Sequence, residues 1–270
     1  MSLFDIVALS LIQGITEFLP ISSSGHLALW PLLTGRPDQG PAMDVAVHLG
    51  TLVAVCLYFR GEFLRLLKGL GQITTGRLST PETRLVWMLA LATLPAIAFG
   101  LYLKLAELQD DLRTLEVIGW ATLLGALALW IADRAPVRRD KAEGWTMRDA
   151  VLLGLAQAVA LIPGTSRSGI CMTMARVLGF DRTEAARLAL LMAMPVILAA
   201  GTVETYGVVK DGDLAFGKDL VLGAVLSCLA ALAALSVMMR MFAGAWTMMP
   251  FVIYRLALGV VLLGLAYSAP

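Results

Sequence analysis

Six long apolar stretches restrict the possible folds of this chain more than any other feature of its sequence. They lie at roughly 42–59, 85–104, 114–133, 185–209, 219–239 and 247–267, each near the ~20 residues that a helix needs to cross a bilayer. Of the 270 residues only 15% are charged, where an average soluble domain has ~25%. The mean hydropathy is +0.80. The sequence therefore predicts an all-α polytopic membrane protein with six transmembrane helices.

Two further apolar segments are interrupted in the middle. Residues 3–34 are broken by Pro20 and a run of serines, and residues 149–179 are broken by "PGTSRSG". Irregular backbone at membrane depth is tolerated only where protein or a wet cavity surrounds it. Each segment is therefore predicted to be a re-entrant helix–loop–helix rather than a span.

The basic residues set the expected orientation. Two loops are rich in them: Arg60, Arg65, Lys68, Arg77, Arg84, Arg134, Arg138, Arg139, Lys141 and Arg148. The alternate loops hold only Lys104 with Arg113, and Lys210 with Lys218. The positive-inside rule places the two basic loops in the cytoplasm. The first re-entrant segment then enters from the outside, the second enters from the cytoplasm, and the C-terminus lies outside.

This order of segments is an inverted-topology repeat within a single membrane domain, 1–270. Its halves cover approximately 1–135 and 146–270 and are joined by a basic cytoplasmic loop. The stretches "LIQGITEFLPISSSG" and "LAQAVALIPGTSRSG" support the repeat, although matching them needs a one-residue offset before the proline. Paired Pro/Gly-interrupted segments indicate a site where the two loops meet near the midplane.

The first broken segment offers groups that bind metal or move protons. Gln13 and Glu17 are four residues apart and share a helix face. Glu17 supplies hard oxygen for a divalent cation, with Gln13 as a neutral second ligand. His26 opens the next half-helix, where it can transfer a proton or attack phosphorus.

Both broken segments offer groups that bind anions. Hydroxyls and free backbone N–H groups at two helix N-termini suit phosphate, and Arg167 adds a fork of donors. The residues expected to contribute are Ser23, Ser24, Gly164, Ser166, Arg167 and Ser168. With the metal carboxylate and the histidine, they indicate phosphoryl chemistry.

Structural interpretations compete with these assignments. The serines could only satisfy backbone groups, and Glu17 with Arg167 could be a structural ion pair. Function is favoured for the pair because an ionisable group at the bilayer centre costs roughly 2.5–3.5 kcal/mol. For Asp44 and His48 a helix-end hydrogen bond is favoured over metal binding, and snorkelling accounts for Arg255.

Composition and architecture leave other functions to weigh. A net charge of +1 gives no reason to expect nucleic acid, and the three scattered cysteines fit neither a disulfide framework nor a zinc site. Broken helices meeting at the midplane are also a transporter architecture, so a transporter or flippase for phosphate or a lipid phosphate is the main alternative. A structural scaffold is disfavoured by the buried charges.

The two interrupted motifs resemble the signatures of a known family. "QGITEFLPISSSGH" with "PGTSRSG" is similar to the undecaprenyl-pyrophosphate phosphatase family of the bacitracin-resistance type. Its (E/Q)xxxE motif is matched by Gln13 and Glu17, followed by His26. Its PGxSRSxxT motif is matched from Pro163 to Ser168. Two positions depart from the pattern: Gln13 stands where other members carry Glu, and Cys171 replaces the closing Thr, with Thr173 two residues further on.

The resemblance implies hydrolysis of undecaprenyl pyrophosphate to the monophosphate and inorganic phosphate. This recycles the lipid carrier for peptidoglycan synthesis and confers bacitracin resistance. It also implies a divalent cation, Mg²⁺ or Ca²⁺, and a place in the bacterial inner membrane among lipids. The positive-inside rule adds the expectation that the site opens to the periplasm. A homodimer is left open.

The expected roles of the site residues follow from the resemblance and the chemistry together. Glu17 with Gln13 holds the metal, and Arg167 with the neighbouring serines binds phosphate oxygens. His26 is either a nucleophile or a base for Ser23 or water. The sequence does not separate these, although acid/base duty is slightly favoured because Ser23 lies three residues before His26.

Overall fold

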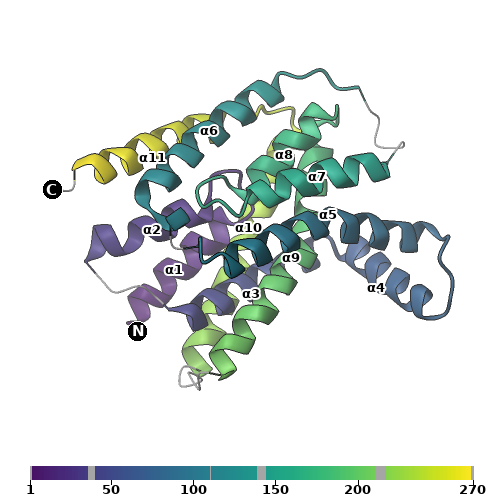
Figure 1. Ribbon diagram of the computed structural model, residues 1–270, viewed down its shortest axis with the longest axis horizontal. Coiled ribbons are helices and arrows are strands. Elements are labelled where there is room, and N and C mark those ends of the chain that lie inside the picture. Colours follow the sequence, from purple (N-terminus) through teal and green to yellow (C-terminus); the bar gives the residue numbers. More distant parts are fainter. Residues whose placement is uncertain (1, 36–39, 110, 139–143, 211–216, 269–270) are drawn as a thin grey trace.

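The computed structural model describes residues 2–35, 40–109, 111–138, 144–210 and 217–268. Across these ranges the chain forms eleven α-helices and one short 3-10 helix, Asp111–Arg113, and no strand. The helices pack into one bundle (Figure 1). Arg139 and Lys141, which belong to the predicted basic loops, lie outside the described residues.

Six of these helices are long and apolar enough to cross a membrane, as the sequence predicts. They are α3 (Pro41–Tyr58), α5 (Pro81–Leu105), α6 (Leu115–Asp133), α9 (Arg182–Lys210), α10 (Gly217–Ala243) and α11 (Met249–Ser268). Local signals set where some of them begin. Thr80 caps α5 by accepting from the Thr83 amide, ahead of a proline at the first helical position, where the missing N–H costs nothing.

The two broken segments each fold as a helix, a break and a second helix. The four helices are α1 (Leu3–Thr16), α2 (Ser23–Thr34), α7 (Met147–Val159) and α8 (Arg167–Val177). The sequence predicted that Pro20 stops α1. The helix in fact ends earlier, at Thr16. Glu17 is its C-cap, still in a right-handed helical conformation. The depth of these segments in a bilayer stays a prediction.

The half-helices are held by crossed packing between the two halves of the chain. Helix α1 packs on α10, and α7 packs on α5. Glycines permit the close approach: a Cβ on Gly14 would lie 2.5 Å from the carbonyl oxygen of Ser227, and one on Gly154 would lie 2.7 Å from that of Ala92. Small residues at such contacts are how membrane helices gain van der Waals packing. The main partner of α1 and that of α7 therefore each lie in the opposite half of the chain.

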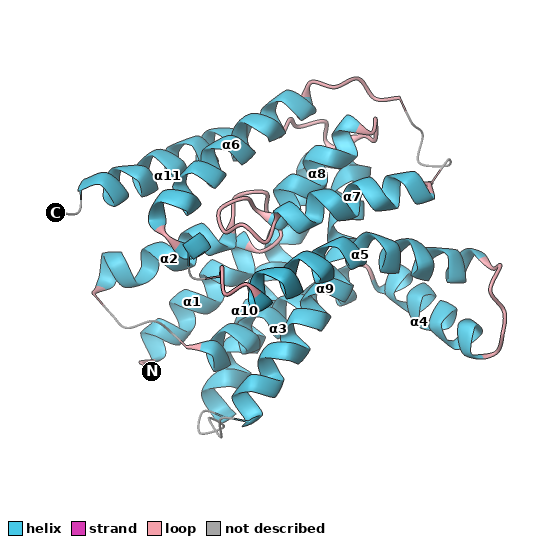
Figure 2. Cartoon of the chain, viewed as in Figure 1, coloured by secondary structure: helices cyan, strands magenta, loops and turns pink. Residues whose placement is uncertain are grey.

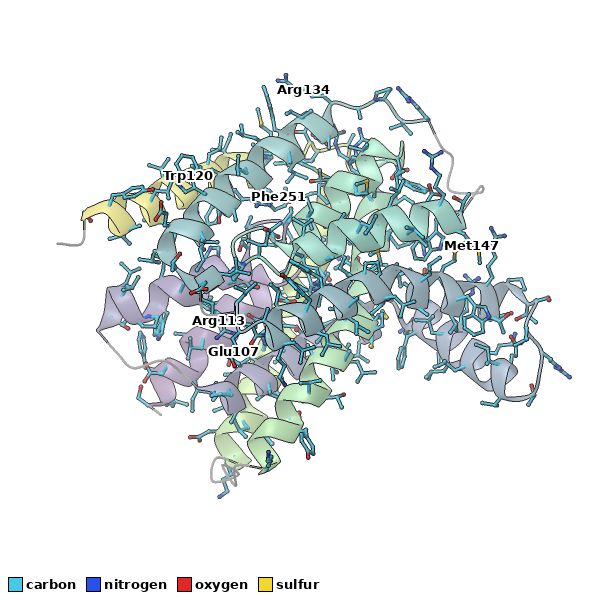
Figure 3. The ribbon with its side chains drawn as sticks, viewed as in Figure 1. Glu107, Arg113, Trp120, Arg134, Met147 and Phe251 are labelled. Atoms are coloured by element: carbon cyan, nitrogen blue, oxygen red, sulfur yellow. The ribbon has the colours of Figure 1, made fainter. Side chains whose placement is uncertain are left out.

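Helices α6 and α11 run side by side along one edge of the bundle (Figure 1). In Figure 3, Trp120 lies in the first half of α6 and Arg134 directly follows its last residue. The Arg134 guanidinium lies 3.8 Å from the centroid of the Trp130 ring, which is cation–π distance. The α6–α11 pair thus forms one wall of the molecule, against which the second broken segment rests through α6 and α8.

One helix was not predicted. Residues Arg60–Thr74 form α4, in a stretch expected to be a cytoplasmic loop. It packs on α5 at Gly69, where a Cβ would lie 2.6 Å from the Glu82 carbonyl oxygen. Its other face keeps Leu64 and Leu67 exposed. The helix is amphipathic rather than uniformly apolar, so a search for continuous apolar stretches misses it.

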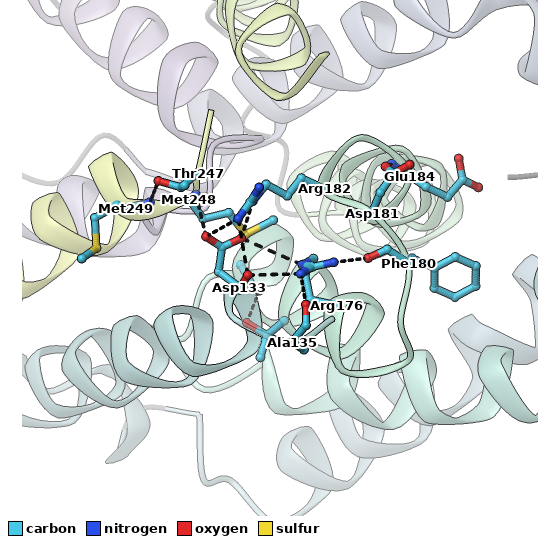
Figure 4. A network of polar contacts seen from close by, with 12 residues as sticks. Asp133, Ala135, Arg176, Phe180, Asp181, Arg182, Glu184, Thr247, Met248 and Met249 are labelled. Carbon is cyan, nitrogen blue, oxygen red and sulfur yellow. Dashed lines mark hydrogen bonds and ion pairs between the residues drawn. The ribbon is translucent and has the colours of Figure 1, made fainter. Parts of the chain in front are cut away.

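A polar network joins α6, α8, α9 and α11 away from the broken loops (Figure 4). Asp133 is its centre: its carboxylate accepts from Arg182 Nε at 2.6 Å and from the Met248 amide at 3.1 Å. Its backbone carbonyl accepts from Arg176 Nη2 at 3.1 Å. The Asp133 carboxylate thus fixes Arg182 and the start of α11, whereas the Arg176 guanidinium donates to backbone carbonyls and its Nε has no hydrogen-bond partner among the described residues.

Candidate active site

The breaks in the two segments meet and hydrogen-bond to each other. Ser24 Oγ accepts from the Gly164 amide at 3.0 Å, and Ser168 Oγ donates to the Leu19 carbonyl at 2.9 Å. In Figure 2 the loops lie close together near the centre of the molecule. Each loop thus supplies one serine to the other, and the polar residues of the two motifs form a single site.

The two breaks have the same local geometry. Ser22 caps α2 with φ 74°, and Ser166 caps α8 with φ 66°; in each case the hydroxyl accepts from the glycine amide three residues on. Gln13 and Gln157 are separated by the same spacing as these two serines. The one-residue offset therefore applies to the prolines alone, and the glutamines and the capping serines of the two segments align without it.

Glu17 is the hub of the site. It is 9% exposed. Its Oε1 accepts from Arg167 Nη2 at 2.8 Å, and its Oε2 accepts from Gln13 Nε2 at 2.9 Å and from Ser23 Oγ at 3.0 Å. Four residues that the sequence singled out are thereby brought into direct contact, from α1, α2 and α8.

Two atoms of this cluster are buried without a hydrogen-bond partner among the described residues: Arg167 Nη1 and Gln13 Oε1. Buried polar groups are nearly always paired, so each exception calls for a reason. One is a cationic donor and the other a neutral acceptor. Together they suit a ligand that combines an anion with a cation.

His48 belongs to this cluster, which the sequence did not indicate. Its Nδ1 lies 2.7 Å from the Asp44 carbonyl oxygen, the helix-end bond that was expected. Its Nε2 points the other way and lies 4.0 Å from Glu17 Oε2. The packing of α1 on α3 brings His48 and Glu17 together. Their separation in the sequence does not predict this contact.

His26 lies apart from the Glu17 contacts. Its Nδ1 is 2.7 Å from the Ser22 carbonyl oxygen, and its Nε2 is 2.6 Å from the hydroxyl of Tyr254 on α11. With both ring nitrogens so engaged, neither bonds Ser23 among the described residues. The hydroxyl of Ser23 instead meets a carboxylate.

The second loop is built tightly around Gly164. This residue has φ +93°, and a Cβ there would lie 2.2 Å from the Ile118 carbonyl oxygen. Glycine is required on both grounds. The neighbouring hydroxyls of Ser166 and Ser168 are 3.2 Å apart and hold the loop together. Their structural duty is therefore established, and phosphate binding by them stays a prediction.

Arg255 does not snorkel, contrary to the sequence-based interpretation. Its side chain is 0% exposed. Its Nη2 donates to the Gly164 and Thr165 carbonyls at 3.2 and 2.8 Å, and its Nε donates to the Thr122 carbonyl at 3.3 Å. A buried guanidinium needs such acceptors. Arg255 therefore ties the second loop to α6 and α11.

The departures from the family pattern are accommodated inside α8. Cys171 is fully buried and lies one turn after Arg167. Thr173 does not replace the missing hydroxyl, because its Oγ1 donates to the Gly169 carbonyl of its own helix at 2.8 Å. The position that carries Thr in the pattern thus presents only a thiol here.

The donors around Glu17 suit a hard divalent cation. Gln13 Oε1 is a buried amide oxygen without a protein partner, next to a carboxylate. Mg²⁺ often takes one or two protein oxygens and completes its shell with water and substrate phosphates. Among the described residues no three His, Cys, Asp or Glu side chains gather as a metal site, so a cation here depends on Glu17 and Gln13 together with its ligand.

Comparison with known proteins places this site in a family. The bacitracin resistance protein BacA family matches residues 6–261. The chain is 50% identical to an undecaprenyl-diphosphatase of Jannaschia sp. (strain CCS1) and 51% identical to one of Ruegeria pomeroyi, each over 99% of this chain and 100% of the relative. One of Chromohalobacter salexigens is 46% identical over 97% of this chain and 98% of its own length. The chain therefore belongs to the BacA family of bacitracin resistance proteins.

Proposed function

We propose that this protein is a membrane-embedded phosphatase that hydrolyses undecaprenyl pyrophosphate to undecaprenyl phosphate and inorganic phosphate. Relatives that cover the whole chain carry the name undecaprenyl-diphosphatase. A product of this kind is the lipid carrier of peptidoglycan synthesis, so its recycling accounts for bacitracin resistance in the family name.

The observation that carries the proposal is the buried Glu17–Arg167 pair with its two unpartnered neighbours. Arg167 Nη1 is a free donor for phosphate oxygen, and Gln13 Oε1 is a free acceptor for a cation. Both sit where the N-termini of α2 and α8 converge, which favours negative charge. A pyrophosphate with a bound divalent cation satisfies all of these groups at once.

The geometry favours Ser23 as the attacking group. Its Oγ donates to Glu17 Oε2 at 3.0 Å, and Gln13 and Arg167 orient the carboxylate. This is the arrangement of a nucleophile, its base and an orienting group. Ser23 Oγ forms a bond to the terminal phosphorus, the bond to the bridging oxygen breaks, and undecaprenyl phosphate leaves with that electron pair. The serine proton passes to Glu17.

A second step regenerates the enzyme. Water attacks the phosphorus, the bond from phosphorus to the Ser23 oxygen breaks, and that oxygen leaves with the electron pair and takes back the proton from Glu17. Inorganic phosphate is released as the attacking water gives up a proton of its own. His26 is the neighbouring side chain that can accept that proton, because it lies three residues from Ser23 on the same helix. Arg167 binds the charge that spreads over the transferred oxygens.

The divalent cation, Mg²⁺ or Ca²⁺, is proposed to be held by Glu17 and Gln13 on the pyrophosphate. It would neutralise phosphate charge and polarise the terminal phosphorus. The support is the unpartnered amide oxygen of Gln13 beside a carboxylate.

The location is proposed to be the bacterial inner membrane, with the site opening to the periplasm. The support is the six apolar helices and the excess of Arg and Lys in the two loops that the positive-inside rule assigns to the cytoplasm. Light scattering of the detergent-solubilised protein will distinguish a monomer from the homodimer that the sequence analysis leaves open.

The test is phosphate release from a C55 or C15 prenyl pyrophosphate by purified protein in detergent, with and without EDTA. Wild type is compared with Arg167→Lys, Ser23→Ala and two matched controls, Arg182→Lys and Ser236→Ala. We expect release that EDTA abolishes, a loss of roughly a hundredfold or more in the two site variants, and near-normal rates in the controls.

Transport is the alternative that the same experiment addresses. A well-folded wild type that binds the prenyl pyrophosphate but releases no phosphate would overturn the hydrolase and favour a transporter or flippase. Release that Ser23→Ala retains would keep the hydrolase and remove Ser23 as the nucleophile.

A further inference from the structure

We propose that Tyr254 is the positioning residue of His26: its hydroxyl fixes the imidazole and occupies Nε2 until the substrate displaces it. The proposal deepens the proposed phosphatase function and rests on it for the role of His26. It comes from a contact between α2 and α11, two helices that the sequence gives no reason to associate.

The contact is specific in geometry. Tyr254 Oη lies 2.6 Å from His26 Nε2, and the two rings are stacked, with centroids 5.5 Å apart and an interplanar angle of 9°. Tyr254 follows Phe251 by one turn on α11; Figure 3 labels Phe251 near the middle of the molecule. The imidazole is therefore held at its Nε2 edge by a phenol ring that lies nearly parallel to it.

The hydrogen-bond partners define which nitrogen carries the proton. Nδ1 faces the Ser22 carbonyl oxygen at 2.7 Å, and a carbonyl can only accept, so Nδ1 must donate. In the neutral ring Nε2 then has the lone pair, and the Tyr254 hydroxyl donates to it. Nε2 is the atom through which His26 can take a proton, and it is the atom that Tyr254 covers.

The surroundings of Tyr254 allow its side chain to move away from His26. Tyr254 is 46% exposed and His26 is only partly buried, so the phenol can turn away without opening the core. The next residue, Arg255, is fully buried and fixed to three carbonyls. The backbone of α11 therefore stays in place while the Tyr254 side chain moves.

The same helix turn thus serves both halves of the site. Tyr254 reaches the first broken segment at His26, and Arg255 reaches the second at Gly164 and Thr165. A substrate phosphate that approaches His26 must exchange places with the phenol. This keeps the base oriented in the resting enzyme and free in the complex.

The first test measures the reactivity of His26 with diethyl pyrocarbonate, which modifies an imidazole nitrogen that has a free lone pair. The chain has two histidines, so fragment-ion mass spectrometry assigns the label, and His48 is the internal reference. Tyr254→Phe keeps the stacked ring and removes only the hydroxyl. Tyr267→Phe, on the same helix but bonded to Glu116, is the matched control.

We expect Tyr254→Phe to raise the labelling rate of His26 by roughly threefold or more, as for the loss of one ordinary hydrogen bond, with His48 unchanged. Tyr267→Phe should label like wild type. Equal His26 rates in all three proteins would overturn the proposal. Labelling requires no turnover, so its failure is distinguishable from failure of the phosphatase function.

The second test is the kinetics of the same variants. Because the hydroxyl holds His26 only until the substrate displaces it, a positioning role predicts that Tyr254→Phe lowers kcat/KM by about tenfold and leaves kcat nearly unchanged. Faster labelling with an unchanged kcat/KM would mean that the phenol only shields His26, which would overturn the positioning role.

Discussion

Arg167 and Glu17 are 150 residues apart in the chain, and their side chains meet at 2.8 Å where the two broken segments join. The pair is largely buried, so each charge depends on the other. Removing one partner of a buried pair costs about 3–5 kcal/mol, whereas replacing both can be neutral. The site and the fold are therefore coupled at this contact.

We predict that Glu17→Gln and Arg167→Met each lower the melting temperature more than the double variant does. The single changes leave an uncompensated charge, and the double change removes both. Thermal unfolding in detergent, followed by tryptophan fluorescence, measures the cycle. Additive losses would show that the two side chains are not coupled. None of the three variants should release phosphate.

Gly164→Ala should prevent the second loop from forming. The methyl group would lie 2.2 Å from the Ile118 carbonyl oxygen, in addition to the strain at φ +93°. Gly76→Ala is the control, because it has φ +76° and open space around it and should cost only about 1 kcal/mol. Expression, melting temperature and phosphate release are compared. A Gly164→Ala protein as stable as Gly76→Ala would contradict the packing described for this loop.

Arg255→Lys should destabilise the protein by about 3 kcal/mol and lower its activity. The N–H donors of a lysine all lie on one nitrogen, so they cannot reach the Thr122, Gly164 and Thr165 carbonyls together. At least one of these carbonyls would then be buried without a donor. Arg240→Lys, an exposed position on α10, should change neither property. Equal melting temperatures for the two variants would argue against the role of Arg255 as a tie.

Gln13→Glu should make stability depend on divalent cations. The new carboxylate would lie against Glu17, whose Oε2 now accepts from Gln13 Nε2 at 2.9 Å. Two buried like charges repel unless a cation lies between them. We expect EDTA to lower the melting temperature of the Gln13→Glu protein and Mg²⁺ to restore it. Both effects should be weak in wild type. The variant should also reach half-maximal activity at a lower Mg²⁺ concentration.

The sequence predicted the spans and the segments that meet because both depend on local composition. A run of about twenty apolar residues predicts a membrane-spanning helix such as α10, and a proline or glycine among serines predicts a break in a helix. The contacts of Glu17 with Gln13 and Arg167 followed from helical spacing and from the pairing of the two breaks. Ser23 was expected to serve His26, but its hydroxyl bonds Glu17 instead.

What the sequence did not indicate depends on packing between distant helices. His48 approaches Glu17 only because α3 lies against α1. Tyr254 and Arg255 are adjacent on an apolar helix. A single arginine in such a helix is usually interpreted as a side chain that snorkels to the membrane interface. Their partners, His26 and the Gly164 carbonyl, lie far away in the chain. Helix α4 was missed because its apolar residues recur along one face of the helix and do not form a continuous apolar stretch.

The crossed packing of the half-helices also sets an order for biosynthesis. Helix α1 begins at Leu3, but α10, on which it packs, begins at Gly217. The first broken segment therefore leaves the ribosome long before the helix that holds it exists. Glu17 and the neighbouring serines therefore reach their final packing only after most of the chain has been made. Helix α7 emerges with its partner α5 already complete, but the second loop gains its tie to Arg255 only when α11, the last helix, has been made.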